Sequence, residues 1–358
     1  MQILDYFFTN PPKIENFYPR KLSLPKEGSF LLTGARGSGK SALVIDYITS
    51  QNRPFLYLDC QDPLFILEEI HLNQLQQFID DEKIHTLILD HYFDGFLEKL
   101  PEAPQLIVVS RENIDLPLKH ISLYPLDFEE FFNFKKSLSP KATFDLYTKF
   151  GSLPRVAKSI APALACREIF FEKFDQQEGK VLLIISIFQA KITTPHQIYQ
   201  IARDYFKISK DWLYKAIEHF TQEGIIYQIE NFHSNVGKKF FLYDFVFSRY
   251  LNKNQTFLAT FDSLVALALI KHNIYIQALR DPLAYIHSNK LIVVAPFESE
   301  EHFWSKVQKN FAQYSKLKIK SVQIVTVNSS YSFDINKISF KAQPFFEWVV
   351  TLSDFSYT

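Results

Sequence analysis

The fold of this 358-residue chain is decided by the stretch FLLTGARGSGKSALVIDYI, which occupies residues 30–48. It opens with a short apolar run, Phe30–Thr33, that is dense enough to be a buried parallel strand. A glycine-rich loop follows, and then an amphipathic helix over residues 40–48. This order of strand, loop and helix, with the spacing G-x-x-x-x-G-K-[ST], predicts a phosphate-binding loop.

Each position of the loop has a physical role. Gly34 and Gly39 allow backbone angles that other residues avoid, and they let the main chain approach a ligand. Successive backbone N–H groups then line a concave nest at the positive end of the helix. Lys40 can reach the β- and γ-phosphates, and the Ser41 hydroxyl can ligate Mg²⁺. The residues predicted to bind the nucleotide are Gly34, Ala35, Arg36, Gly37, Ser38, Gly39, Lys40 and Ser41.

The alternative is a glycine-rich turn before an ordinary helix. It is disfavoured because the loop satisfies both the spacing and the context of the motif. The sequence therefore predicts a nucleoside triphosphate, with Mg²⁺, as the ligand of this chain.

Composition limits the other possibilities. The chain carries 39 Lys and Arg residues against 39 Asp and Glu residues, so a nucleic-acid surface would have to be local. The two cysteines, Cys60 and Cys166, lack the spacing of a metal or redox site and fit a reducing compartment. Neither a signal peptide nor an apolar run of membrane-spanning length is evident. We expect a cytoplasmic protein that does not bind membranes.

After the motif, the sequence predicts a second strand over residues 54–59, which ends in an acid, and an amphipathic helix over about residues 63–80. The next buried strand, residues 84–90, ends in Asp90. At the carboxyl edge of a parallel sheet this carboxylate would lie beside the phosphate-binding loop and order the Mg²⁺ shell. The alternative is an aspartate that only starts a turn. A further strand, residues 106–110, ends in Ser110, where a sensor residue would contact the γ-phosphate. Strands that alternate with helices predict an α/β fold with a doubly wound parallel sheet.

Two later phrases resemble a known family. PLDFEEF, residues 125–131, is similar to the PLSFxEF signature of the archaeal-type ATPases, which are prokaryotic AAA+-like P-loop proteins related to the STAND class. YTKFGSLP, residues 147–154, is similar to their YxxxGGxP element, whose proline packs near the adenine; this implies ATP as the nucleotide and a binding role for Pro154. Family members continue into a winged helix and a restriction-endonuclease-like domain.

The resemblance covers nearly the whole chain and implies four segments. These are a P-loop ATPase core with its lead-in (1–125), a helical lid subdomain (126–175), a winged helix (176–251) and a nuclease-like α/β domain (252–358). Within the lead-in, residues 19–21 either lie across the nucleotide pocket or form a solvated arm. The rest of the lead-in shows few signs of regular structure.

The chain departs from the family directly after Asp90. Hydrolysing relatives usually carry glutamate there to polarise the attacking water, whereas this chain has His91. A neutral imidazole can accept a proton, and Asp94 is an alternative base. Arg111 is either a charge stabiliser or an exposed arginine at a strand end. We therefore expect ATP binding with at most slow hydrolysis, and the candidate catalytic residues are Lys40, Asp90, His91 and Ser110.

Residues 180–251 independently fit a winged helix, with three helices and a hairpin. The third helix, residues 212–222, could enter a DNA major groove. Lys210 and Lys215 belong to this region and Lys238 and Lys239 to the wing, but acidic residues are interspersed. DNA binding and a packing or sensing role both remain open for this segment.

The last segment has the helix and strand order of a restriction-endonuclease-like fold, including a helix over residues 299–317, but it lacks the chemistry of a nuclease. A nuclease needs an aspartate and a Glu-x-Lys pair around Mg²⁺. Ala284 occupies the aspartate position, and residues 291–295 contain no acid and no lysine. Asp262 alone cannot hold a catalytic metal. We expect no nuclease activity and a structural or protein-binding surface.

Two function hypotheses follow. The first is a slow AAA+/STAND-like ATPase that acts as a nucleotide-dependent switch. The second is a DNA-binding winged-helix regulator in which ATP is a structural or sensory ligand. A homo-oligomer with a trans arginine finger is also open, with Arg111 and Arg155 as candidates, although a surface ion pair is the default for both.

Overall fold

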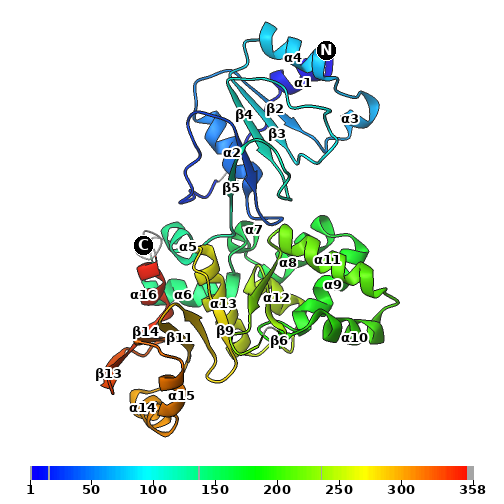
Figure 1. Ribbon diagram of the computed structural model, residues 1–358. Coiled ribbons are helices and arrows are strands. Elements are labelled where there is room, and N and C mark those ends of the chain that lie inside the picture. Colours follow the sequence, from blue (N-terminus) through cyan, green and yellow to red (C-terminus); the bar gives the residue numbers. More distant parts are fainter. Residues whose placement is uncertain (1, 15–16, 136–137, 235, 353–358) are drawn as a thin grey trace. The chain divides into compact units, whose positions relative to one another are not determined.

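The structure is a computed structural model, and it describes all residues except 1, 15–16, 136–137, 235 and 353–358. The first residue of the predicted segment 1–125 and the last six residues of the predicted segment 252–358 therefore lie outside the described residues. The chain divides into two compact units: residues 1–126 together with 222–225, and residues 127–221 together with 226–358. Figure 1 shows the elements of each. No helix in the described residues is long and apolar enough to cross a membrane.

The first unit is a five-stranded sheet whose strands all run parallel, in the order β2-β3-β4-β1-β5. The strands are β1 (Phe30–Thr33), β2 (Phe55–Asp59), β3 (Thr86–Asp90), β4 (Gln105–Val109) and β5 (Lys119–Ser122). The helices are α1 (Gln2–Thr9), α2 (Lys40–Thr49), α3 (Leu64–Leu67) and α4 (Leu72–Asp81). This arrangement confirms the α/β, P-loop NTPase fold predicted for the core.

Alternation along the strands explains why both faces of this sheet are covered. In β3, Leu87 and Leu89 pack into one cluster with apolar residues of α1 and α4. Ile88, between them, packs into a second cluster with apolar residues of α2. Successive side chains of a strand point to opposite faces, so an all-apolar strand must be buried on both. Helices on both faces in Figure 1 satisfy this requirement.

Two local predictions for this unit were wrong. The lead-in contains a helix, α1, which is held because Ile3, Leu4 and Phe7 are buried in the first cluster. The single helix expected over residues 63–80 is instead split into α3 and α4, with Glu68 in an extended conformation between them.

The second unit begins with helices and ends with a mixed sheet. Its first nine helices and three short strands are α5 (Phe128–Phe134), α6 (Pro140–Phe150), α7 (Pro154–Lys158), α8 (Pro162–Lys173), α9 (Gln176–Ile187), β6 (Ile192–Thr193), α10 (Pro195–Tyr205), α11 (Lys210–Gln222), β7 (Ile226–Glu230), β8 (Lys238–Leu242), α12 (Phe245–Leu251) and α13 (Phe257–Lys271). The strands β6, β8 and β7 form an antiparallel three-stranded sheet.

The remaining elements build a six-stranded sheet in the order β13-β14-β12-β11-β10-β9. They are β9 (Gln277–Leu279), β10 (Ala284–His287), β11 (Lys290–Val294), α14 (Glu300–Lys309), α15 (Phe311–Lys316), β12 (Ser321–Thr326), β13 (Tyr331–Ile335), β14 (Ile338–Pro344) and α16 (Phe345–Trp348). The sequence did not predict β13 and β14, and the helix expected over 299–317 is interrupted at Asn310. Ala284 and residues 291–294 lie on strands β10 and β11 as expected.

Candidate functional site

The phosphate-binding loop connects β1 to α2, and two of its glycines are required by geometry. Gly34 has a φ of 145°, and a Cβ atom there would lie 2.1 Å from the carbonyl oxygen of Leu123. Leu123 is fixed in this position because its N–H donates to Thr33 O at 2.8 Å. Gly39 has a φ of 97° and precedes the first turn of α2 in the left-handed region. The N-terminus of a ten-residue helix therefore opens directly onto the loop.

Two cations brace the loop. The Lys40 ammonium donates to Gly34 O at 2.6 Å and to Ala35 O at 3.3 Å, so its charge lies over the loop itself. The Arg20 guanidinium donates to Ser38 O at 2.9 Å and to Tyr124 O at 2.7 Å. Arg20 is therefore not part of a solvated arm, whereas a position of residues 19–21 across the nucleotide pocket stays a prediction.

Arg36 forms a buried ion pair with Glu223. Its guanidinium lies 2.9 Å from Glu223 Oε1, and both side chains are almost completely buried. Glu223 belongs to the short segment 222–225 that groups with the first unit. A charge pair removed from water in this way is costly to break, because either partner alone would be a buried charge without compensation.

Tyr57 lies beside both predicted Mg²⁺ ligands. Its hydroxyl donates to Asp90 Oδ2, and the nearby Ser41 side chain lowers its pKa. Burial raises the pKa of Tyr57 first, and the neighbouring Asp90 carboxylate raises it further. Asp90 is fully buried, and its Oδ1 accepts the N–H of His91 at 2.8 Å. A hydroxyl and a carboxylate brought together are the oxygen ligands that Mg²⁺ prefers, so these residues fit the ion.

His91 is oriented by an acid that the sequence did not single out. His91 Nδ1 lies 2.8 Å from Asp59 Oδ1. The two come together because β2 and β3 pair in a register that places Asp59 beside Asp90, the residue before His91. His91 also has a φ of 52°, a left-handed conformation that is uncommon for a residue with a side chain. The site thus holds its histidine in one orientation, partly exposed to solvent.

The other candidates fall in different places. Ser110 follows β4 and is buried, and its hydroxyl accepts the N–H of Glu112 at 3.2 Å. Arg111 donates to Gln61 at 3.2 Å, and Asp94 is exposed. Pro154 is the first residue of α7 and belongs to the second unit. Arg155, also in that unit, pairs with Glu168 and Glu172, so the default of a surface ion pair holds for it.

One of the two lysines expected on the surface of the wing, Lys239, is buried. Lys239 is 1% exposed, and its ammonium lies 2.5 Å from Asp262 and 3.0 Å from the hydroxyl of Tyr285. It therefore cannot contact a nucleic acid. Lys210, Lys215 and Lys238 remain exposed, but three lysines beside Asp211 and Glu218 make a weak basic surface. The same contact gives Asp262 a structural role.

Replacing Tyr57 by phenylalanine should weaken the fold around Asp90. The substitution keeps the ring but leaves a fully buried carboxylate with one hydrogen bond fewer, which costs about 1–3 kcal/mol. Hydrogen exchange of the β2 and β3 amides measures this locally. Tyr47→Phe, in the same unit, is the matched control because its hydroxyl donates to the neutral carbonyl of Pro25. Equal effects of the two substitutions would contradict a special role of Tyr57.

Comparisons with known proteins found similarities among solved structures alone. No family model matches the sequence, and no curated protein matches it. Among solved structures, the Walker-type ATPase PABY2304 of Pyrococcus abyssi is 13% identical, with a TM-score of 0.43, over 63% of this chain and 91% of that one. The ORC1 protein of Aeropyrum pernix, solved with DNA, is 11% identical, with a TM-score of 0.30, over 64% and 87%. Drosophila ORC bound to DNA is 13% identical, with a TM-score of 0.23, over 63% and 80%.

Proposed function

We propose that the first unit binds ATP with Mg²⁺ at the loop between β1 and α2 and hydrolyses it slowly. The observation that carries this proposal is the Tyr57 hydroxyl, which donates to Asp90 and lies near the Ser41 side chain. The hydroxyl of the phosphate-binding loop and the carboxylate of a separate strand thus approach the same phenol. A structural glycine turn would have no need of this arrangement.

The residues divide the work as follows. Backbone N–H groups of the loop and the Lys40 ammonium hold the phosphates, and Ser41 and Asp90 hold the ion. When bound, Mg²⁺ neutralises charge on the phosphate oxygens. Lys40 is placed for its role by its bonds to the loop carbonyls, which phosphate oxygens would replace as acceptors. To bind ATP, the Lys40 ammonium would therefore only exchange the carbonyl oxygens of Gly34 and Ala35 for phosphate oxygens, without moving far.

His91 is the proposed base. With its Nδ1–H directed at Asp59, its Nε2 is the nitrogen that can accept a proton. A water molecule would pass its proton to Nε2 as its oxygen bonds to the γ-phosphorus, and the bond to the bridging oxygen would break to give ADP and phosphate. The Asp59 carboxylate stabilises the imidazolium that forms. Because the glutamate usual at this position is replaced by a partly exposed imidazole, we expect slow turnover.

The switch role rests on Arg36. Phosphate oxygens that bind at the loop compete with Glu223 for this guanidinium, because arginine binds phosphate and carboxylate in the same geometry. Release of Glu223 would free the segment 222–225, which continues directly from α11. Nucleotide can shift such an equilibrium only if the two states bind it differently, and an ion pair lost in one of them supplies that difference.

Turnover by the full chain tests this proposal. Mg²⁺-dependent phosphate release from ATP should exceed that of Lys40→Ala, which removes the cation that contacts the loop carbonyls. The assay is run with and without duplex DNA at two salt concentrations. Salt-sensitive stimulation by DNA would favour the regulator hypothesis, since phosphate contacts weaken as salt rises. Turnover equal to that of Lys40→Ala would reject the ATPase proposal.

A further inference from the structure

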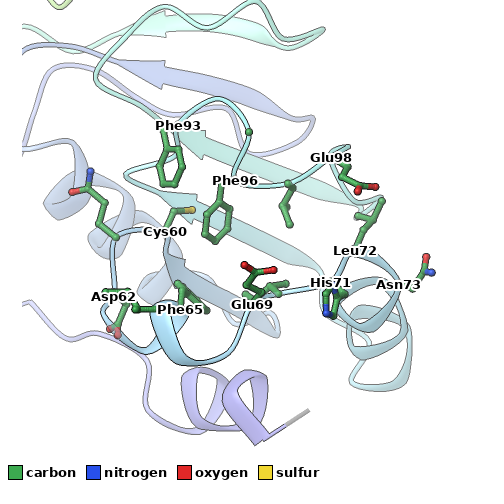
Figure 2. A pocket seen from close by; sticks show the side chains of 15 residues that line it. Cys60, Asp62, Phe65, Glu69, His71, Leu72, Asn73, Phe93, Phe96 and Glu98 are labelled. Atoms are coloured by element: carbon green, nitrogen blue, oxygen red, sulfur yellow. The ribbon is translucent and has the colours of Figure 1, made fainter.

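A groove with a volume of about 840 Å³ lies in the first unit, outside the nucleotide site. Two segments line it: residues 60–73, which follow β2, and residues 93–98, which follow β3. Figure 2 shows side chains from both segments directed into the same space, among them Phe65, Phe96 and Glu69. All of its lining residues belong to one compact unit.

The groove has an apolar, aromatic base. Phe96 packs against Phe65 with ring centroids 5.6 Å apart and against Phe93 at 5.5 Å. At its rim, Ile66 is 84% exposed, and the adjoining Leu67 is 86% exposed. Single exposed apolar residues are normal on protein surfaces, but here they adjoin an apolar groove, which is typical of an interaction site.

The charged side chains that line the groove are acidic. The two lining segments contain Asp62, Glu68, Glu69, Asp94 and Glu98 and no lysine or arginine. Asp62, Glu69 and Glu98 line the groove itself. The whole chain has equal numbers of acidic and basic residues, so this imbalance is local. Such a lining repels phosphates and attracts cations, which favours a basic ligand over a nucleic acid.

We propose that this groove binds a basic segment of a partner protein in which apolar side chains alternate with lysine or arginine. The apolar side chains would pack on Phe65, Phe93 and Phe96 and cover Ile66. The cationic side chains would face Glu69 and Glu98 at the rim. Burying the exposed apolar atoms favours binding, and the rim charges select the partner and speed association. This inference does not depend on nucleotide binding.

Fluorescence anisotropy with the full chain, without nucleotide, tests the proposal. The probe is a labelled short peptide in which leucine alternates with lysine. We expect saturable binding that weakens with salt. A peptide with glutamate in place of lysine and one with serine in place of leucine should each bind about tenfold more weakly or worse. Absence of saturable binding, or equal binding of the three peptides, would overturn the proposal.

Variants locate the binding site. Glu69→Lys combined with Glu98→Lys, and separately Ile66→Ser combined with Leu67→Ser, should each reduce affinity about tenfold or more. All four side chains are exposed, so the fold should persist, and circular dichroism checks this. Glu301→Lys with Asp334→Lys makes the same change of charge at exposed positions of the second unit and should leave affinity unchanged. Equal losses in this control would place the peptide elsewhere. Self-association abolished by Ile66→Ser with Leu67→Ser would assign the groove to a second copy and overturn the proposal.

Discussion

Asp262→Ala should destabilise the second unit by about 3–5 kcal/mol, the cost of leaving a buried charge without its partner. Asp262 and Lys239 are both about 1% exposed and pair at 2.5 Å, and Tyr285 donates to Asp262 and accepts from Lys239. The contact joins β8 to α13 and β10. All three tryptophans, Trp212, Trp304 and Trp348, lie in this unit, so urea unfolding followed by tryptophan fluorescence reports it directly.

The loss should depend on pH in a defined direction. Burial lowers the pKa of Lys239, and Asp262 opposes this shift. In Asp262→Ala the carboxylate that raises the pKa of Lys239 is gone. The pKa of Lys239 in the folded state therefore lies further below its value in the unfolded chain. Between these two pKa values the unfolded state binds more protons, and the free energy of unfolding therefore increases with pH. The variant should recover part of its stability as the pH is raised toward about 10.4, the ordinary lysine pKa.

A second variant distinguishes the cost of an unpaired buried charge from the cost of lost packing. Lys239→Met, Asp262→Leu and Tyr285→Phe together replace the polar cluster by apolar groups of similar size, and such replacements are often neutral or stabilising. The triple variant should unfold near the wild-type urea midpoint. If Asp262→Ala alone stayed within about 0.5 kcal/mol of wild type, the ion pair would not be a stabilising contact.

His91→Ala should lower ATP turnover about 10²–10⁴-fold, the usual contribution of a positioned proton acceptor. The KM for ATP should change little, because the substitution leaves Lys40 and Ser41 in place. Asp59→Asn keeps a hydrogen-bond partner for Nδ1 but removes the negative charge, so kcat should fall while KM stays constant. Asp59 is therefore a positioning residue for His91.

Asp94→Asn is the matched control, since Asp94 is the alternative base and is an exposed residue of the same loop. It should retain wild-type turnover. The opposite pattern, in which Asp94→Asn abolishes turnover and His91→Ala does not, would assign the base to Asp94. Rates are compared at several pH values, because loss of a titrating base changes the pH profile as well as the rate.

The sequence predicted those parts of the site that are encoded locally. The phosphate-binding loop is one continuous motif, and β3 is a continuous apolar run ending in Asp90, so both could be located without knowledge of tertiary structure. The roles of Tyr57 and Asp59 could not. They depend on the pairing of β2 with β3, and this register places Asp59 beside Asp90 across 31 positions of sequence. The sequence therefore indicates β3 and its terminal Asp90, but not that Tyr57 and Asp59 of β2 lie beside them.

The burial of Lys239 likewise could not be predicted from the sequence, because it depends on tertiary packing. Two adjacent lysines in a hairpin suggest an exposed wing, yet successive residues of a strand face opposite ways, and Lys238 is exposed while Lys239 is buried. Its partner Asp262 lies on a helix that follows the hairpin, α13. Only the packing of these elements decides that the charge is paired internally. Buried ion pairs of this kind leave no local signal in a sequence.

We infer that the first unit binds ATP with Mg²⁺ through Lys40, Ser41 and Asp90. Calorimetric titration of the full chain with ATP, in Mg²⁺ and in excess chelator, measures this binding without relying on turnover. We expect one site per chain whose affinity falls sharply without Mg²⁺ and whose binding is lost in Lys40→Ala. ATP binding that is unchanged in Lys40→Ala and indifferent to Mg²⁺ would contradict it.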